Sequence, residues 1–360
     1  MEIIKKGEKI QYLNIIKAVS IFLVVFCHLV ILKYDGIIDN ICMLVCWLAV
    51  PCFVLVNGAI LLNKKLDIKK HYQKTCIIYI VNIAWRILYL LIYILCLNFD
   101  IQSVSKVDIL KYIFLFQNLT PINVSHFYFI EIILSIYLIF PIIHICFNGN
   151  ADGRKALFMM TIIIFLFTYF INAVSFLGEY VIEDKRISIE GLSNVFLFGK
   201  YARFLLLFIL GGFLHLYKDR IQSIKGITFI CILTIIISLG MLVLSKYLMY
   251  GTFEWRGIYI QGGYDKISTF AMSVAFFIVM QNRIIKNKMF SKIIEEIGTS
   301  TLGIFYLHIP ILVILNQYVY NMIAYKGVIM NLLKTIIVII VSYMIIRILR
   351  KIPILKKLVS

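Results

Sequence analysis

The sequence predicts an all-α integral membrane protein, a bundle of about ten transmembrane helices whose N- and C-termini are cytoplasmic. Hydrophobic residues make up 62% of the 360 residues and charged residues 15%, whereas soluble domains have about 45–50% and about 25%. The apolar residues form runs of about 18–23, the length that a helix needs to cross roughly 30 Å of hydrocarbon. Runs such as TIIIFLF and TIIVIIVSYMII do not alternate apolar and polar residues, as the strands of a transmembrane barrel would. The sequence therefore predicts membrane-spanning helices.

The spans follow one another along the whole chain, and residues 1–360 are taken as a single transmembrane domain. Neither an internal repeat nor a soluble domain is evident in the sequence. The sixth and eighth spans are short for a membrane crossing. The predicted spans are residues 13–33, 40–62, 76–97, 126–147, 155–176, 201–217, 226–247, 266–283, 300–320 and 329–349.

The basic residues predict the orientation. Counted alternately along the chain, most of the 36 Lys and Arg residues fall on the side of the N-terminus. Because positive residues favour the cytoplasmic side, both termini are predicted to be cytoplasmic. The long connections 98–125, 177–200 and 248–265 then face outward. These connections carry aromatic residues, Trp255 among them, that would suit the binding of a sugar. The alternative is that they only connect helices.

The first predicted span carries three polar residues on one side. Lys17 and His28 lie within about 20° of each other on a helix and about 16 Å apart along its axis. Asn14 lies within about 60° of both. Since ionisable groups in hydrocarbon are costly, this polar line is predicted to face a bundle interior or a water-filled cavity.

His28 is the candidate catalytic residue, because histidine transfers protons near neutral pH. Glu131 lies in the fourth span at a depth similar to that of His28. A carboxylate that orients a histidine is a recurrent arrangement, so one hypothesis pairs Glu131 with His28. The alternative pairs Glu131 with Arg86 in the third span. The alternative for His126 is a place at the membrane interface. The alternative for His28 and His308 is a purely hydrogen-bonding role.

A dense group of cations, in the segment NKKLDIKKHYQK, precedes the third span. It is either a topological anchor or a dock for a phosphorylated cytosolic ligand, since clustered Lys residues attract phosphates. The net charge of +18 is spread over short connections and does not indicate nucleic-acid binding. Nothing in the sequence matches a Walker loop, a dinucleotide fingerprint or a zinc-protease motif. The cysteines form no CxxC pair and predict no metal site.

Several segments carry a resemblance, and they occur in a matching order. They are LNIIKAVSIFLVVFCHLV at the start, VPCFVLVNGAILL at 50–62, HFYFIEIILSIYLIFP at 126–141, FILGGFLH, FEWRG and IGTSTLGIFYLHIPI. Together they resemble the acyltransferase-3 family of membrane O-acyltransferases, in particular the branch that acetylates surface polysaccharides. The sequence has Asn14 where the family often has Asp and Lys17 where Arg is usual. It has His71 and Lys74 where two Arg are usual, and Lys does not reproduce bidentate Arg binding.

The resemblance implies acyl transfer across the membrane. The donor would be acetyl-CoA or another acyl-CoA, with no metal, bound from the cytoplasm. We assign donor binding to Lys17, Lys70, Lys74 and Arg86.

The acceptor implied by the resemblance is a surface glycan or a lipid-linked saccharide. His28 would be the base or carry the acyl group, and Glu131 would orient it. Acceptor binding is assigned to His126 and Trp255. The expected location is the plasma membrane among lipids, as a multi-pass protein of a bacterium, and the sequence leaves a homo-oligomer open.

Two other functions compete with acyl transfer. A transporter or flippase for a glycan or lipid-linked sugar would also have many helices and buried charges, although such proteins often show repeats and broken helices. A non-enzymatic partner in a surface-polymer assembly complex would tolerate loss of His28.

Overall fold

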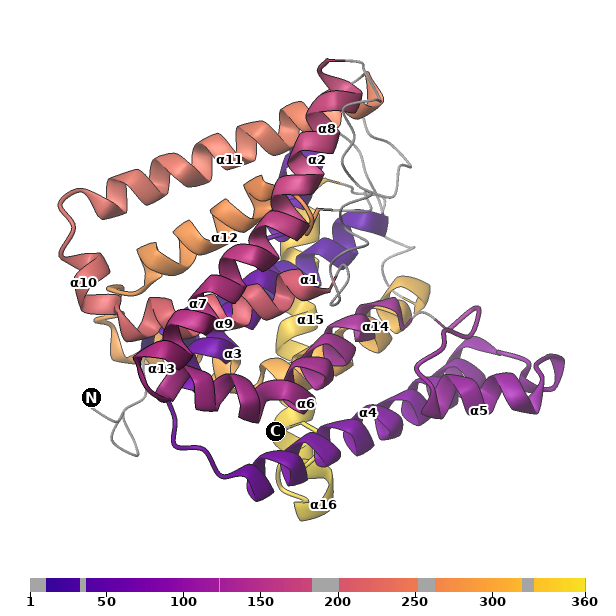
Figure 1. Ribbon diagram of the computed structural model, residues 1–360. Coiled ribbons are helices and arrows are strands. Elements are labelled where there is room, and N and C mark those ends of the chain that lie inside the picture. The colour runs from indigo at the N-terminus through magenta and orange to yellow at the C-terminus, as the bar shows by residue number, and fades with distance from the viewer. Residues whose placement is uncertain are drawn as a thin grey trace. The chain divides into compact units, whose positions relative to one another are not determined.

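The computed structural model in Figure 1 describes residues 11–32, 37–122, 124–182, 201–251, 263–318 and 327–359. Throughout these residues the secondary structure is helical, apart from one isolated bridge between Leu119 and Ile122. The prediction of an all-helical fold is confirmed for this part of the chain. The predicted acceptor residue Trp255 lies outside the described residues.

The described residues fall into two compact units. The first unit comprises the chain up to Lys65, residues Ile142–Thr301 and the start of α15. Its helices are α1 (Gln11–Leu32), α2 (Ile37–Cys46), α3 (Ala49–Leu62), α7 (Ala151–Phe165), the π-helix η3 (Leu166–Phe170), α8 (Ile171–Tyr180), α9 (Ala202–Leu216), α10 (Lys218–Gln222), α11 (Ile227–Tyr250), α12 (Ile267–Met280) and α13 (Lys288–Thr299).

The second unit comprises Leu66–Pro141, the part of the chain from Leu302 to the end of α14, and the chain from Ile336 onward. The helices α6 and α15 each contribute residues to both units, and α14 contributes its first residue, Thr301, to the first unit. The remaining helices are α4 (Ile68–Leu97), η1 (Ile101–Ser103), α5 (Lys106–Phe114), η2 (Ser125–Phe127), α6 (Tyr128–Asn148), α14 (Thr301–Tyr318), α15 (Val328–Leu349) and α16 (Pro353–Lys356).

Eight candidate spans within the described residues are long and apolar enough to cross a membrane. They correspond to eight of the ten predicted spans. The other two correspond to α9 and α12, which have 15 and 14 residues. At 1.5 Å per residue these helices are about 21–22 Å long, short of the roughly 30 Å of hydrocarbon.

The helix α11 has the surface expected of a lipid-facing helix. Its exposed side chains are large and apolar, and Phe229, Ile236 and Leu244 are among them. A soluble protein would not leave such a face in water, whereas hydrocarbon solvates it at no cost. The exposed faces of α7 and α15 are apolar in the same way.

The third predicted span starts earlier than expected. Its helix α4 begins at Ile68 rather than near residue 76, so part of the cationic segment is helical and is not a loop. The reason is a cap, because the Asp67 side chain accepts a hydrogen bond from the Lys70 backbone N–H at 3.0 Å. Asp is among the best residues for this position.

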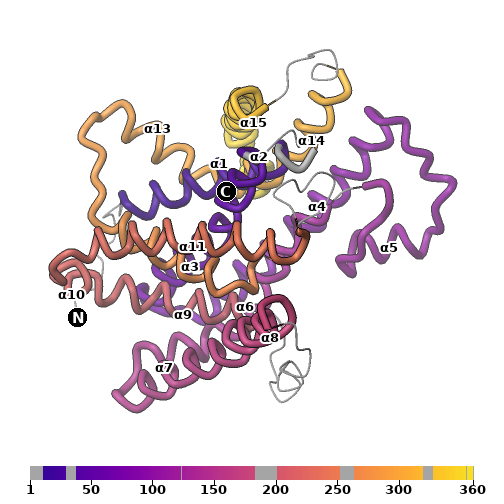
Figure 2. The backbone as a smooth tube through the Cα atoms, turned by 90° about the horizontal axis from the view of Figure 1, so that it is seen from above, coloured from indigo at the N-terminus to yellow at the C-terminus, as the bar shows by residue number. Residues whose placement is uncertain are grey.

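Two glycines allow α3 and α9 to approach backbone to backbone in the first unit, and Figures 1 and 2 both show these helices next to each other. A Cβ on Gly58 would collide with the carbonyl oxygen of Phe208, and one on Gly211 would collide with that of Leu55. Small residues at such crossings are typical of membrane helices, where close packing replaces the hydrophobic effect. The Gly58 of the VNGA segment is therefore a packing requirement.

We predict that Gly58→Ala destabilises the protein, because the collision involves backbone atoms that cannot rotate away. Overpacking costs about 1–3 kcal/mol, and the loss is measured as a lower melting temperature of the detergent-solubilised protein. The matched control is Gly240→Ala in α11, where a Cβ meets nothing within 4 Å. That change should stabilise slightly, by about 0.5–1 kcal/mol. Equal melting temperatures for the two variants would contradict the packing account.

Candidate active site

Lys17 and His28 lie on one uninterrupted helix, α1, in the first unit. The helix confirms the first predicted span, and because it has no break, the two side chains keep the angular offset of about 20° and the separation of about 16 Å. Both side chains are half-buried. The helix packs against α2, α3, α12 and α13 of the same unit.

The N-terminal half of α1 is fixed by α13 and by the segment before it. Gln11 donates through Nε2 to Ser291 Oγ at 2.6 Å, and its Oε1 accepts from the Ile285 backbone N–H at 3.2 Å. A Cβ on Gly298 would lie 2.9 Å from the Asn14 carbonyl oxygen, so α13 crosses α1 in close contact at Asn14. The amphipathic α13 was not predicted, because its segment is too polar for a membrane span.

A second cation, Lys64, interacts electrostatically with Lys17 in this unit. Its backbone is held in place by α6, since His144 Nε2 donates to the Lys64 carbonyl oxygen at 2.7 Å. Asn148 likewise donates to the Leu62 carbonyl oxygen at 2.9 Å. These contacts satisfy carbonyl groups at the end of α3 that have no helical partner. The result is a pair of like charges at the N-terminal end of α1, an arrangement that favours an anion.

In the second unit, the predicted donor residues Lys70 and Lys74 are exposed near the start of α4. Lys70 forms an ion pair with Asp67 at 3.0 Å. The hydrogen bond from the Lys70 backbone N–H and the ion pair with its side chain lower the pKa of the Asp67 carboxyl below its ordinary value. His71 is engaged differently, because its Nε2 donates to the Tyr137 carbonyl oxygen at 2.8 Å.

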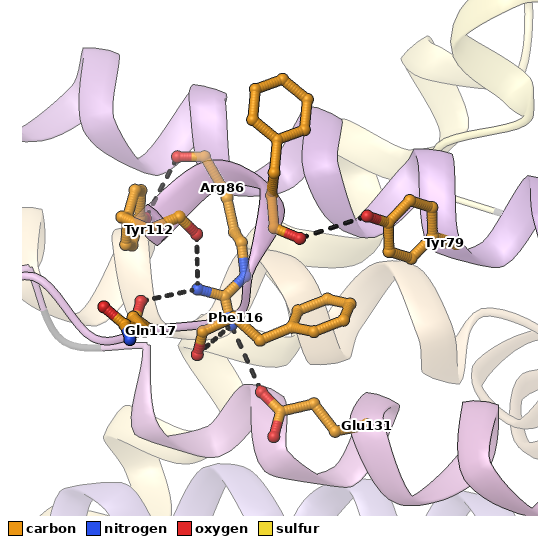
Figure 3. A network of polar contacts seen from close by, with 7 residues as sticks. Tyr79, Arg86, Tyr112, Phe116, Gln117 and Glu131 are labelled. Atoms are coloured by element: carbon orange, nitrogen blue, oxygen red, sulfur yellow. Dashed lines mark hydrogen bonds and ion pairs between the residues drawn. The ribbon is translucent and has the colours of Figure 1, made fainter. Parts of the chain in front are cut away.

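Arg86 is the most completely buried cation of the second unit, with 1% of its surface exposed. As Figure 3 shows, its guanidinium points at the chain that follows α5. Nη1 donates to the carbonyl oxygens of Tyr112 and Gln117 at 3.0 and 3.1 Å. Nη2 donates to that of Phe116 at 3.4 Å and to Glu131 Oε1 at 3.3 Å. These bonds occupy four of the five guanidinium N–H groups.

The aromatic rings of Tyr112, Phe116 and Phe127 surround the same guanidinium, each within 5.5 Å of its carbon. Burial raises the pKa of the Tyr112 hydroxyl above its ordinary value, and Arg86 opposes this only in part. Tyr112 therefore stays protonated and donates to the Arg86 carbonyl oxygen at 3.1 Å. Arg86 and Tyr112 thus bind each other's backbone and tie α4 to α5.

Glu131 is paired with Arg86, which is the alternative that the sequence left open. The Glu131 side chain remains 38% exposed, unlike the buried Arg86. Glu131 belongs to the second unit and His28 to the first. Their pairing therefore stays a prediction.

His126 is buried and bound to the aromatic core of the second unit. Tyr89 donates its hydroxyl hydrogen to the Tyr306 carbonyl oxygen at 2.8 Å. The Tyr89 oxygen must then accept from His126 Nε2, 3.1 Å away. The ring of His308 lies 5.1 Å from that of His126. His126 is therefore packed inside the protein, and its predicted place at the membrane interface stays a prediction.

Comparison with known proteins decides the family. A family model described as an acyltransferase domain, acyltransferase family 3, matches residues 10–348. The chain belongs to the acyltransferase-3 family. No curated protein and no solved structure matches it. The resemblance carried by the sequence segments is thus confirmed, and the protein is a membrane acyltransferase in general terms.

Sequence reasoning missed several residues of this acyltransferase-3 protein that build the second unit. Trp85 stacks on Tyr306 with ring centroids 5.1 Å apart and an angle of 4° between the planes. Trp85, Arg86 and Tyr89 share a helix face with Asn82, three and four residues apart. This spacing was a usable signal, because a helix facing only lipid would not place Asn, Trp, Arg and Tyr in one line.

We predict that Arg86→Lys destabilises this acyltransferase-3 protein strongly. A lysine lacks the planar fork that reaches three carbonyl groups and Glu131 together, and removing one partner of a buried pair typically costs about 3–5 kcal/mol. The measurement is the melting temperature and the monodisperse yield in detergent.

The matched control for this change is Arg283→Lys, at an exposed position. It should change stability by less than about 0.5 kcal/mol. An Arg86→Lys protein as stable as the control would contradict the role given to the guanidinium.

We predict that Asp67→Ala loosens the first turn of α4, whereas Asp67→Asn does not, because Asn retains a side-chain oxygen that caps the helix. Hydrogen exchange of the Lys70 amide should be several times faster in the Ala variant than in the wild type. Since the pKa of Asp67 is lowered in the folded protein, the stability that its carboxylate gives to the folded state is fully present above the ordinary carboxyl pKa. It is lost as the pH falls through the lowered value. Equal exchange in both variants would contradict this cap.

Proposed function

We propose that this acyltransferase-3 protein transfers an acyl group, acetyl in the simplest case, from cytosolic acyl-CoA to a hydroxyl group of a cell-surface or lipid-linked glycan. The observation that supports this most directly is the placement of Lys17 and His28 on one helix of one unit, about 16 Å apart. A cation at one end suits the phosphates of a donor, and a histidine at the other suits proton transfer. The family supplies the acyl-transfer chemistry.

His28 is proposed as the general base. A lone pair of its imidazole takes the proton of the acceptor hydroxyl group while the hydroxyl oxygen forms a bond to the thioester carbonyl carbon. The carbon–sulfur bond then breaks, and the coenzyme A thiolate takes the proton from the imidazolium. The products are an ester of the glycan and coenzyme A, and His28 returns to its neutral form.

The donor phosphates are proposed to bind to lysines. In the first unit, Lys17 and its neighbour Lys64 form the pair of like charges described above. In the second unit, Lys70 and Lys74 lie exposed at the start of α4. Arg86 is proposed to position α5 instead of binding the donor, because only its Nε–H lacks a partner among the described residues.

We predict that His28→Ala and His28→Gln abolish acyl transfer while leaving protein level and monodispersity unchanged. The loss of a general base typically lowers the rate by about 10²–10⁴-fold. Membranes carrying each variant receive radiolabelled acetyl-CoA and the crude surface glycan of the host, and base-labile label on the glycan is counted. Equal label in the wild type and in both variants would rule out His28 as the base. No label in any of them, with the protein folded, would favour the transporter alternative.

A matched pair of substitutions tests the donor site. Lys17→Arg keeps the charge that attracts phosphate and should leave the KM for acetyl-CoA within a few-fold of the wild type. Lys17→Met removes the charge and should raise that KM about tenfold or more, since a charged hydrogen bond is worth about 1.5–3 kcal/mol. If Lys17→Met lowers kcat at an unchanged KM, Lys17 does not bind the donor.

A further inference from the structure

Lys246 is a buried cation in the first unit that the proposed reaction does not use. It lies near the C-terminal end of α11 with 1% of its surface exposed. Its Nζ has no hydrogen-bond partner among the described residues. The contact that the ammonium makes is with the ring of Tyr250, 5.7 Å from the ring centre. A buried charge in a membrane protein is costly unless something compensates it.

Three other buried polar atoms, on or next to helices that pack against α11, also lack partners within the described part of the chain. They are Asp265 Oδ1, just before α12, Thr269 Oγ1, in the first turn of α12, and Trp47 Nε1, just after α2. Asp265 interacts electrostatically with Lys246, and α11 packs along both α12 and α2. The Trp47 ring contacts that of Tyr264, with centroids 4.6 Å apart. We call Lys246, Asp265, Thr269 and Trp47 the polar cluster.

The surroundings of the polar cluster are positively charged. Lys266 adds a second cation near Lys246, and Arg203 and Asp265 both act electrostatically on Tyr169. Among the described residues, two cations, Lys246 and Lys266, thus lie near the one carboxylate of the cluster. An anionic group is the compensation that this balance favours.

The polar cluster is connected to His28 through α2. Cys27, the neighbour of His28 on α1, contacts Met43 of α2 through the two sulfur atoms at 3.4 Å. Trp47 follows Met43 by four residues, about one helical turn further along the chain. The cluster and the proposed base therefore belong to the same unit, and Trp47 lies about one helical turn along the chain from the residue that contacts the neighbour of His28.

We infer that the polar cluster binds the acceptor and that the acceptor is an anionic saccharide, such as a uronate- or phosphate-bearing glycan. Lys246 would pair with the carboxylate or phosphate group, and Asp265 and Thr269 would bind sugar hydroxyl groups. Trp47 would donate its N–H to a sugar oxygen. A phospholipid headgroup fits less well, because it offers fewer hydroxyl groups to Asp265 and Thr269 than a saccharide does.

This inference rests on the proposed function only in calling the ligand the acceptor. Binding of the ligand can be measured without any acyl donor. The full-length protein in nanodiscs of neutral lipid is titrated with tetragalacturonate, with neutral galactotetraose and with a galactose phosphate. The wild type should bind the two anionic probes at least about tenfold more tightly than the neutral one, as expected for a charged hydrogen bond. Equal affinity for charged and neutral probes would overturn the inference.

Variants separate the charge from the rest of the cluster. Lys246→Met should remove the preference for anionic probes, and Lys246→Arg should keep it. The exposed control Lys225→Met should change nothing. Trp47→Phe should weaken all three probes by a similar factor, because it removes a donor and no charge. If the Lys246→Met protein still prefers the anionic probes, Lys246 does not bind their charged group.

Two further outcomes would also overturn the inference. First, phosphatidylglycerol could be added to the nanodisc at constant ionic strength. If it displaces tetragalacturonate competitively, the cluster is a lipid site. Acyl transfer to neutral and charged glycans at equal rates would leave the proposed function intact and remove its anionic acceptor. Conversely, binding of anionic probes that depends on Lys246 in a protein without acyl transfer would remove the proposed function and keep the site.

Discussion

Hydrocarbon leaves no water to satisfy a buried polar group, and this constraint shapes both units of the protein. Its clearest expression is Arg86, a cation held within the apolar part of the second unit. The chain after α5 turns through a left-handed residue, Phe116, at φ 58°, so carbonyl groups in the last turn of α5 and in the chain after it have no helical partner. Arg86 takes three of these carbonyl groups and Glu131 as its acceptors. One unusual residue in a helix thereby fixes the loop that follows another helix.

The same constraint appears in the first unit at the end of α3. There His144 and Asn148 of α6 satisfy carbonyl groups that the helix leaves open, and they hold Lys64 where it acts on Lys17. Lys246 is the contrast, because no described residue satisfies its ammonium group. The fully bound groups support the fold, whereas the partnerless ammonium of Lys246 is the observation behind the proposed ligand site.

The sequence predicted the helical class and the apolar spans because hydrophobic runs of this length have few other solutions in a membrane. It also predicted α1 with Lys17 and His28 in line, since spacing within one helix does not depend on tertiary structure. It placed the start of α4 too late, because the cap at Asp67 is a local signal hidden among lysines. The choice between Arg86 and His28 as the partner of Glu131 needs the neighbour relations of the helices, which spacing along the chain does not contain. For the same reason, the sequence did not show that Tyr89 is hydrogen-bonded to Tyr306, which is far from it along the chain.

The central claim is that an acyl group passes from a donor at the lysine-bearing end of α1 to an acceptor at the His28 end. The most direct measurement uses sealed proteoliposomes with protein of known orientation, a glycan enclosed in the lumen and radiolabelled acetyl-CoA supplied outside. If the N-terminal side of α1 faces outward to the donor, the enclosed glycan should become labelled, and the His28→Ala protein should leave it unlabelled. Label that appears only when donor and glycan share one side of the membrane would contradict transfer along α1.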